Sequence, residues 1–427
     1  DTFHIKEYIN KNHPKSAILA GGGFIGLELA ENLRELGMDV TIVQRPKQLM
    51  NPFDSDMASM IHNEMRKHGI KLVLGYTVEG FREKDNGVEV LLKDNPSLQA
   101  DMVVLAIGVT PDTALAKEAG LELGIKGSIV VNDRMETSVP DIYAAGDAVQ
   151  VKHYVTGDDA LISLAGPANK QGRIIADNIC GGDSHYLGSQ GSSVIKVFDM
   201  TAATTGINET NAKKSGLEVD TVILSPMSHA GYYPGGKVMT MKVVFEKETY
   251  RLLGAQIIGY EGVDKRIDVL ATAIHAGLKA TQLKDLDLAY APPYSSAKDP
   301  VNMAGFMIDN IAKGTLKQWH LEDMDKISKD KNVVLLDVRT VGEFNRGHMK
   351  GFNNIPVDEL RERISEIEKG KPVYLICQSG LRSYIASRIL EGNGYETYNF
   401  SGGFRFYDTV VNDRALIERA YACGMDY

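Results

Sequence analysis

The glycine-rich segment Gly21-Gly22-Gly23-Phe24-Ile25-Gly26 constrains the fold of this chain more than any other feature. It follows an apolar run at 15–20 and precedes residues 27–36, whose apolar spacing predicts a helix. In such a strand–turn–helix unit, the first glycine permits the turn, the second admits a pyrophosphate and the third allows close packing. The segment therefore predicts a dinucleotide site, although a glycine-rich turn without ligand is the alternative. The predicted contact residues are Gly21, Gly23, Phe24, Ile25 and Gly26.

The end of the next predicted strand, residues 39–44, bears on the choice of nucleotide. An acidic side chain there would accept hydrogen bonds from the ribose of NAD, but this chain has Gln44 followed by Arg45. A glutamine can bond either ribose form, and an arginine can pair with a 2′-phosphate. NADH and NADPH both stay open, and Arg45 has the alternative of being a solvated loop residue.

Alternating strands and helices over about the first 110 residues predict a parallel α/β domain. Longer strands at 237–246 and 250–259, followed by helices at 263–277 and 302–313, indicate an α+β block. The last part of the chain returns to an α/β pattern.

Composition excludes several classes of function. Lys plus Arg number 47 and Asp plus Glu number 56, giving a net charge of −9, so a broad nucleic-acid-binding surface is not expected. No apolar run approaches the roughly 18 residues that span a bilayer. The cysteines Cys180, Cys377 and Cys423 are too few for a disulfide framework or a four-ligand zinc site. We expect a cytoplasmic protein without a metal.

The segment from Cys377 to Ser383 follows an apolar strand and precedes a predicted helix. Backbone N–H groups at a helix start favour a thiolate, and Arg382 would add a fixed positive charge. Four residues separate Cys377 from Arg382, one fewer than in the loop of cysteine phosphatases, so the loop suits a single sulfane sulfur better than a phosphate. The alternative is a buried, inert thiol.

Three further segments are interpreted through their resemblance to a known family. Residues 137–147, 105–111 and 164–173 resemble the flavin-binding parts of pyridine nucleotide–disulfide oxidoreductases, with 137–147 as the flavin-contacting strand. The resemblance implies that Asp147 bonds the ribityl chain and that the helix starting near Leu164 points its N-terminus at the flavin ring. It places Glu28 near the nicotinamide, with an ordinary first-turn helix acid as the alternative. The flavin contacts so implied are Gly108, Gly146, Asp147, Leu164 and Ala165.

In this family the FAD domain is split, and its first half carries another glycine motif and a redox-active cysteine. The 20 residues before Gly21 are too short for a strand–helix–strand unit of about 30 residues. We therefore expect the N-terminal FAD-binding half to be missing from this sequence, the FAD site to be incomplete, and the chain not to be reductase-competent alone.

Residues 191–313 resemble the dimerisation domain of the family, which implies a homodimer. The loops at 229–236 and 289–300 are similar to those of coenzyme A–disulfide and persulfide reductases. In that subgroup, tyrosines at the positions of Tyr232 and Tyr290 reach the partner's thiol site and could donate a proton to a departing thiolate. The alternative is that these tyrosines only pack at the interface.

Residues from about 319 to 411 resemble a rhodanese domain, through the motif at 335–351, Asn354-Ile355-Pro356 and Ser401-Gly402-Gly403-Phe404. The resemblance implies a sulfur-carrying Cys377 with Arg382 beside it. The residues expected to serve mainly as structural hydrogen-bonding groups are Asp337, Arg339, Glu343 and His348.

Together these features predict an α/β protein of four parts. These are an NAD(P)H-binding Rossmann-type domain (1–112), the C-terminal remnant of an FAD domain (113–188), an α+β dimerisation domain (189–314) and a rhodanese-like domain (315–427). The resemblance implies a flavin-dependent NAD(P)H reductase of coenzyme A disulfide, coenzyme A persulfide or polysulfide. The alternatives are an NADH oxidase or peroxidase of the same fold, and a non-redox dimeric sulfurtransferase scaffold.

Overall fold

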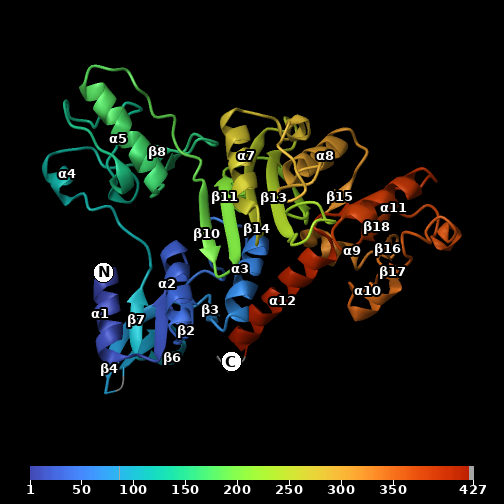
Figure 1. The fold of residues 1–427 in the computed structure, drawn as a ribbon, viewed down its shortest axis with the longest axis horizontal. Coiled ribbons are helices and arrows are strands. Elements are labelled where there is room, and N and C mark those ends of the chain that lie inside the picture. The colour runs from blue at the N-terminus through green and yellow to red at the C-terminus, as the bar shows by residue number, and fades with distance from the viewer. Residues whose placement is uncertain (86, 423–427) are drawn as a thin grey trace.

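The computed structural model describes residues 1–85 and 87–422, and its elements form four units along the chain (Figure 1). The first unit, residues 2–105, contains β1 (Ser16–Ala20), α2 (Phe24–Glu35), β2 (Asp39–Gln44), α3 (Ser55–Lys67), β3 (Lys71–Leu74) and β7 (Met102–Leu105). These strands form a parallel sheet in the order β3-β2-β1-β7. Helix α2 begins at Phe24, before the predicted residue 27, because the glycine motif itself supplies its first turn. The predicted Rossmann-type arrangement is confirmed.

Two features of the first unit lie outside that sheet. An antiparallel sheet is formed by β4 (Val78–Lys84), β5 (Gly87–Leu92) and β6 (Asn95–Ala100). Helix α1 (Thr2–Asn12) was not expected from the sequence, and none of its residues is buried. The hydroxyl of Tyr8 attaches it to the rest of the unit by donating to the carbonyl of Asp101.

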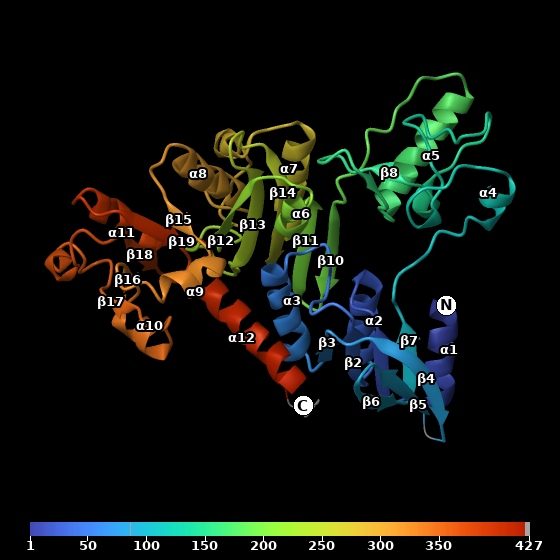
Figure 2. The same ribbon diagram turned by 180° about the vertical axis from the view of Figure 1, so that it is seen from behind.

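The second unit, residues 114–179, stands apart from the first sheet in both views (Figures 1 and 2). It contains α4 (Ala114–Glu118), β8 (Val151–Lys152), β9 (Asp159–Ala160), α5 (Ala165–Ile179) and two short 3-10 turns at Ile125–Gly127 and Gly146–Ala148. Its small core is built on Ile129, Met135, Val149 and Val151.

The expectation of a continuous strand over 137–147 is wrong for this structure. Within the described residues the segment has only the single bridge between Glu136 and Tyr143, and its end at Gly146 is a 3-10 turn. Its backbone groups are paired locally instead, since the Thr137 N–H donates to the carbonyl of Ile142 and the Ala144 N–H donates to the carbonyl of Met135.

The third unit, residues 193–312, is an antiparallel sheet in the order β10-β11-β14-β13-β12 with helices on it. Its elements are β10 (Ser193–Val197), β11 (Met200–Gly206), α6 (Glu209–Lys214), β12 (Val219–Leu224), β13 (Met239–Glu246), β14 (Leu252–Gly259), α7 (Val263–His275), the 3-10 helix Ala280–Asp285 and α8 (Pro300–Ala312). Strands β13 and β14 and both long helices match the predicted segments within a few residues. The predicted α+β block is confirmed.

The fourth unit, residues 318–422, is a parallel sheet in the order β15-β19-β18-β16-β17. Its elements are β15 (Gln318–Trp319), α9 (Met324–Ile327), β16 (Val334–Asp337), α10 (Val341–Arg346), β17 (Asn353–Asn354), β18 (Val373–Ile376), α11 (Leu381–Glu391), β19 (Thr397–Phe400), α12 (Gly403–Ala422), and 3-10 turns at Leu321–Asp323 and Ile364–Glu366. Cys377 directly follows β18 and lies just before α11.

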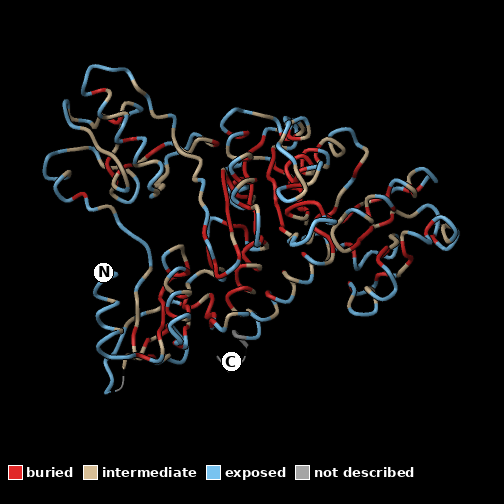
Figure 3. The backbone as a smooth tube through the Cα atoms, viewed as in Figure 1, coloured by how far each residue is buried: buried red, intermediate tan, exposed pale blue. Residues whose placement is uncertain are grey.

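The last helix does not stay within its own unit. Helix α12 extends from the fourth unit across α3 of the first unit (Figures 1 and 2). Phe406 and Val410 of α12 belong to the same buried cluster as Met57, Ile61 and Met65 of α3. Figure 3 shows buried chain running through the sheets, with exposed loops at the periphery. Among the described residues, none of the helices has the length and apolar character that a bilayer span requires.

Candidate functional site

The glycine-rich turn has the geometry that a bound dinucleotide requires. Gly21 has φ +115°, and a Cβ there would lie 2.1 Å from the carbonyl oxygen of Ala106. A Cβ on Gly26 would lie 2.1 Å from the carbonyl oxygen of Gly21. A Cβ on Gly23, in contrast, would meet nothing within 4 Å, and no side chain caps α2 at this end. The first and third glycines are therefore demanded by packing, whereas the second borders open space beside uncapped N–H groups.

A cavity of about 430 Å³ opens beside this turn, with Gly21, Gln44 and Arg45 among its lining residues. The Gln44 Oε1 atom accepts a hydrogen bond of 3.0 Å from the Gly22 N–H, so Gln44 shapes the turn and has only its amide nitrogen free to point at a ligand. Arg45 is exposed. Of the other predicted contacts, Ile25 and Glu28 are exposed on α2, while Phe24 packs against the core. The cavity fits a nucleotide.

The predicted flavin contacts other than Gly108 lie where the start of α5 meets the turn at Gly146. The Gly146 N–H donates a 2.7 Å hydrogen bond to Oε1 of Gln171, a buried residue of α5 that the sequence did not single out. Asp147 is exposed, and Leu164 precedes the uncapped start of α5 at Ala165. A Cβ on Gly108 would meet nothing within 4 Å. The exposed backbone at Gly108 and the free N–H groups at the start of α5 leave room for a flavin beside these residues.

The two predicted tyrosines lie together. The hydroxyls of Tyr232 and Tyr290 are 2.8 Å apart, and both side chains are exposed. This hydrogen bond with Tyr232 raises the pKa of Tyr290 above its ordinary value.

A buried arginine that the sequence did not single out holds the two tyrosine-bearing loops. Arg266 of α7 is 1% exposed, and its Nη2 donates 2.8 Å to the carbonyl of Ser228, at the start of the first loop. The same nitrogen lies 3.1 Å from Asp299, at the end of the second loop. A lone arginine in a helix gives no sequence signal for such a role.

Cys377 is 1% exposed, and two groups of the following turn face its sulfur. The Gly380 N–H and the Ser383 hydroxyl each donate to Sγ at 3.2 Å. Gly380 has φ +97°, a conformation that favours glycine and that turns its N–H toward the thiol. The turn therefore places two hydrogen-bond donors on this one sulfur.

Arg382 does not stand as a free cation beside the thiol. Its two terminal nitrogens each lie 2.7 Å from a carboxylate oxygen of Glu343. The hydrogen bonds from Arg382 lower the pKa of Glu343 to about 2. Glu343 also caps α10, where Thr340 and Glu343 form a reciprocal capping box.

The other hydrogen-bonding groups predicted in the fourth unit have structural partners. The buried Arg339 guanidinium binds Asp337 through Nε and Nη2, and its Nη2 also donates to the carbonyl of Gly347 at 2.8 Å. His348 stacks on Phe344 at 3.8 Å between ring centroids.

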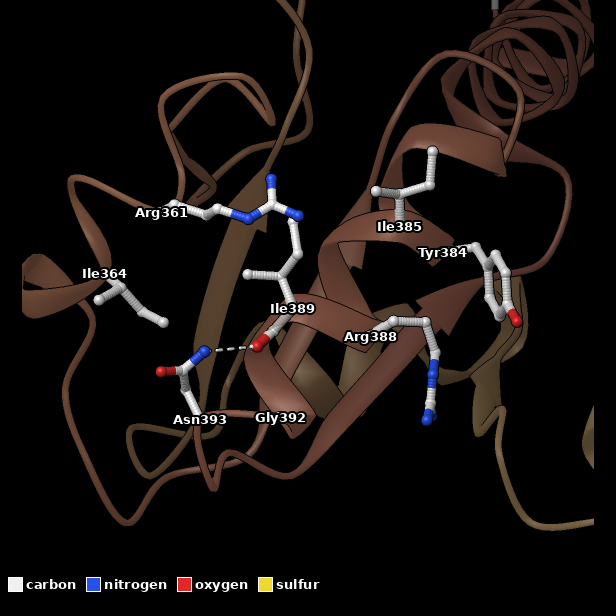
Figure 4. Close-up of a pocket in the computed structure, with 8 residues that line it drawn as sticks. All are labelled: Arg361, Ile364, Tyr384, Ile385, Arg388, Ile389, Gly392 and Asn393. Atoms are coloured by element: carbon white, nitrogen blue, oxygen red, sulfur yellow. Dashed lines mark hydrogen bonds between the residues drawn. The ribbon is translucent and has the colours of Figure 1, made fainter.

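The structure therefore separates the predicted residues into groups on different units. The glycine-rich turn is on the first unit. Four of the predicted flavin contacts are on the second unit, and Gly108 lies in the segment between these two. The tyrosine pair is on loops of the third unit, and Cys377 is on the fourth (Figure 1). A further hollow lies along α11 (Figure 4), and its eight lining residues include none of the predicted site residues. Cys180 is exposed at the end of α5, and Cys423 lies outside the described residues.

Comparisons with known proteins agree with this division. Sequence models match for the pyridine nucleotide-disulphide oxidoreductases at 4–172, their dimerisation domain at 192–300 and the rhodanese-like domain at 320–408. The NAD(P)H sulfur oxidoreductase (CoA-dependent) of Pyrococcus abyssi is 37% identical over 302 residues, 70% of this chain and 67% of that protein.

Two solved structures resemble the chain over nearly its whole length. The reduced CoADR-RHD of Bacillus anthracis has a TM-score of 0.93 and 47% identity over 97% of this chain and 74% of that one. The NAD-dependent persulfide reductase of A. fulgidus has a TM-score of 0.87 and 39% identity over 94% of this chain and 74% of that one. With its dinucleotide turn, paired interface loops and rhodanese-like unit, this chain belongs to the pyridine nucleotide-disulphide oxidoreductase family.

Proposed function

We propose that this chain acts as an NAD(P)H-dependent reductase of coenzyme A disulfide, coenzyme A persulfide or polysulfide, and that Cys377 carries sulfane sulfur for it. The observation that carries the proposal is a thiol held by two donors, from Gly380 and Ser383, in the same chain as an open dinucleotide turn. The names of the relatives support the same substrates: one is a CoA-dependent sulfur oxidoreductase and one a persulfide reductase.

The net reaction is a two-electron cleavage of a sulfur–sulfur bond. For a persulfide RSSH, hydride from NAD(P)H breaks the bond and leaves RSH, HS⁻ and NAD(P)⁺. FAD, the family's cofactor, supplies two-electron transfer between nicotinamide and sulfur when it is bound. In this chain the residues proposed to hold it are Gly108, Gly146, Asp147, Leu164 and Ala165.

The chain's own residues bind and orient the nucleotide and supply a proton to the departing thiolate. The open backbone at Gly23 and the uncapped start of α2 bind the pyrophosphate, and the Gln44 amide nitrogen with Arg45 meets the ribose. One hydroxyl of the Tyr232–Tyr290 pair donates its proton to a departing thiolate, and the other hydroxyl hydrogen-bonds to the phenolate oxygen left behind. The matched dimerisation model supports a homodimer that brings these exposed tyrosines to a partner's thiol site.

Sulfur transfer at Cys377 is an exchange between sulfur atoms. The thiolate attacks the outer sulfur of a persulfide anion RSS⁻, a bond forms to Cys377 Sγ, and the bond to the inner sulfur breaks with release of RS⁻. Because Cys377 is 1% exposed, the sulfur donor has to approach it through the surrounding loop.

Two assays test the proposal: a reductase assay on the chain supplemented with FAD and with an N-terminal FAD-binding half of the family, and a sulfur-transfer assay on the chain alone. We expect NAD(P)H to be consumed with coenzyme A persulfide or disulfide, and thiosulfate–cyanide sulfur transfer to be lost in Cys377→Ser but unaffected in Cys180→Ser. Consumption of oxygen in place of the disulfide would support the oxidase alternative. Sulfur transfer without NAD(P)H-dependent reduction of any disulfide would support the non-redox sulfurtransferase.

A further inference from the structure

Helix α3 occupies the meeting point of three units. It packs on β3 of its own sheet, on β10 and β14 of the third unit, and on α12 of the fourth (Figures 1 and 2). Seven of its residues are buried, which is more than an ordinary surface helix with one apolar face would show: Met57, Ala58, Ser59, Ile61, His62, Glu64 and Met65. Among them, His62 is 1% exposed and carries two ring nitrogens that need partners.

Both ring nitrogens of His62 are hydrogen-bonded, and to different units. Nε2 accepts from the backbone N–H of Leu49 at 3.0 Å. A ring nitrogen that accepts carries no hydrogen, so Nδ1 carries the proton and donates to Oδ2 of Asp413 on α12 at 2.8 Å. The other oxygen of Asp413 is paired with Arg66 of α3. A carboxylate of the fourth unit therefore fixes the tautomer and orientation of a histidine in the first unit.

The segment that His62 holds is the support of the nucleotide turn. The N–H of Met50 donates to the carbonyl of Gly22 at 2.8 Å. The Leu49 side chain fills the space beside Gly22, where a Cβ would lie 2.3 Å from it. Met50 has φ +51°, a left-handed conformation that a residue other than glycine keeps only where its surroundings hold it. Asn51, the next residue, lines the nucleotide cavity.

From this unbroken path we propose that Asp413 and His62 are positioning residues for the nucleotide-binding turn, and that NAD(P)H binding and the docking of α12 on α3 favour each other. The path runs from Asp413 through His62 to Leu49, and from Met50 to Gly22. Because coupling between two sites is reciprocal, a bound nucleotide that orders the turn also steadies α12. The inference rests on the nucleotide binding proposed above.

The first test measures nucleotide affinity in the full chain by the change in NADH fluorescence. Asp413→Ala removes the partner of Nδ1 and is expected to weaken NADH binding about five-fold. Asp413→Asn keeps an oxygen for Nδ1 and is expected to bind within about two-fold of the parent. Asp408→Ala, which removes an exposed carboxylate from the same helix, is the matched control and should bind as the parent does.

A second variant separates positioning from general packing. Val410→Ala trims a fully buried side chain of α12 that lies in the same cluster but has no bond to His62. The proposal predicts that this variant lowers the melting temperature without weakening NADH binding. Equal loss of affinity in the Val410 and Asp413 variants, at equal loss of stability, would overturn the proposal.

Hydrogen exchange gives a readout independent of the nucleotide. Asp413→Ala is expected to speed exchange at the Leu49 and Met50 amides, while Val410→Ala is not. In the parent chain, NADH is expected to slow exchange in α12. If the parent does not bind NADH, the proposed function fails, and the exchange at Leu49 and Met50 still decides whether Asp413 supports the turn. Unchanged exchange there in the Asp413 variant refutes the path itself.

Discussion

The guanidinium of Arg382 and the carboxylate of Glu343 form a two-point ion pair, with both nitrogen–oxygen distances at 2.7 Å. Arg382 sits five positions after Cys377, and the pairing directs its charge to a carboxylate as well as to the thiol loop. The donors that touch the sulfur are instead Gly380 and Ser383. This division of tasks leads to two predictions.

Ser383 is predicted to set the reactivity of Cys377. Ser383→Ala removes one of the two groups that donate to the Cys377 sulfur, so the sulfur-transfer rate is expected to fall about ten-fold. Ser387→Ala is the control, since Ser387 is equally buried on α11 but donates to the carbonyl of Tyr384. An equal loss of rate in both variants would contradict the assignment.

Glu343 is predicted to make the fourth unit sensitive to acid. Its pKa is lowered from 4.5 to about 2 in the folded chain, so it stabilises the fold fully above pH 4.5 and loses that contribution as pH falls toward 2. Glu343→Gln should therefore unfold more easily than the parent at neutral pH, with the gap closing in acid. The only tryptophan, Trp319, is buried in this unit, so its fluorescence reports the unfolding. A gap that stays constant with pH would refute the prediction.

Replacing Gly23 by alanine is predicted to affect mainly NADH binding, whereas replacing Gly21 is predicted to affect mainly stability. Gly23→Ala puts a methyl group into open space, so the cost in stability is about 0.5 kcal/mol while NADH binding is lost. Gly21→Ala meets the Ala106 carbonyl at 2.1 Å with φ +115°, so it costs on the order of 3 kcal/mol. Thermal unfolding and NADH titration of both variants check this. Unimpaired NADH binding by Gly23→Ala would place the pyrophosphate elsewhere.

Arg45 is predicted to read the 2′-phosphate. It is exposed and lines the nucleotide cavity, so Arg45→Ala should weaken NADPH about ten-fold and NADH by less than about two-fold. Lys71→Ala, an exposed cation at the start of β3, serves as the control. Equal losses for both nucleotides would assign Arg45 to the pyrophosphate or to solvent.

The hydroxyl pair of Tyr232 and Tyr290 is predicted to act in disulfide cleavage and not in nucleotide binding. Tyr290→Phe removes one proton donor, so kcat with coenzyme A disulfide should fall about ten-fold or more while NADH affinity is kept. Tyr294→Phe, an exposed phenol of the same loop, should change neither. If Tyr290→Phe lost activity only because it no longer dimerises, the tyrosines would be interface packing residues. Light scattering, which measures the oligomeric state, distinguishes that case.

The fold and the candidate site could be predicted from the sequence where the functional residues and the local backbone geometry belong to one short segment. The turn at Gly21 and the loop at Cys377 each combine a strand, special backbone and a helix start within a few residues, and the structure has those elements there. The parallel first sheet and the long strands of the third unit also follow from periodicity. The predicted boundaries between the four parts stay a prediction.

What could not be predicted depends on residues far apart in the chain. His62 and Asp413 are 351 positions apart, and neither belongs to a motif. Arg266 holds the tyrosine loops through backbone carbonyls, which no side-chain pattern announces. The pairing of Arg382 with Glu343 joins two residues that were singled out separately. Helix α1 was missed because its apolar side is small: none of its residues is fully buried, and only the half-buried Ile5 and Ile9 pack against the core.

The path of α12 bears on how such a chain can be cut or recombined. Because this helix begins in the rhodanese-like unit and packs Phe406 and Val410 into the core of the first unit, the two units do not fold independently of each other. Removing the unit after about residue 314 would strip Phe406 and Val410 from that core and leave the buried His62 without its carboxylate. A functional exchange of rhodanese units between relatives would therefore have to carry over α3 together with α12.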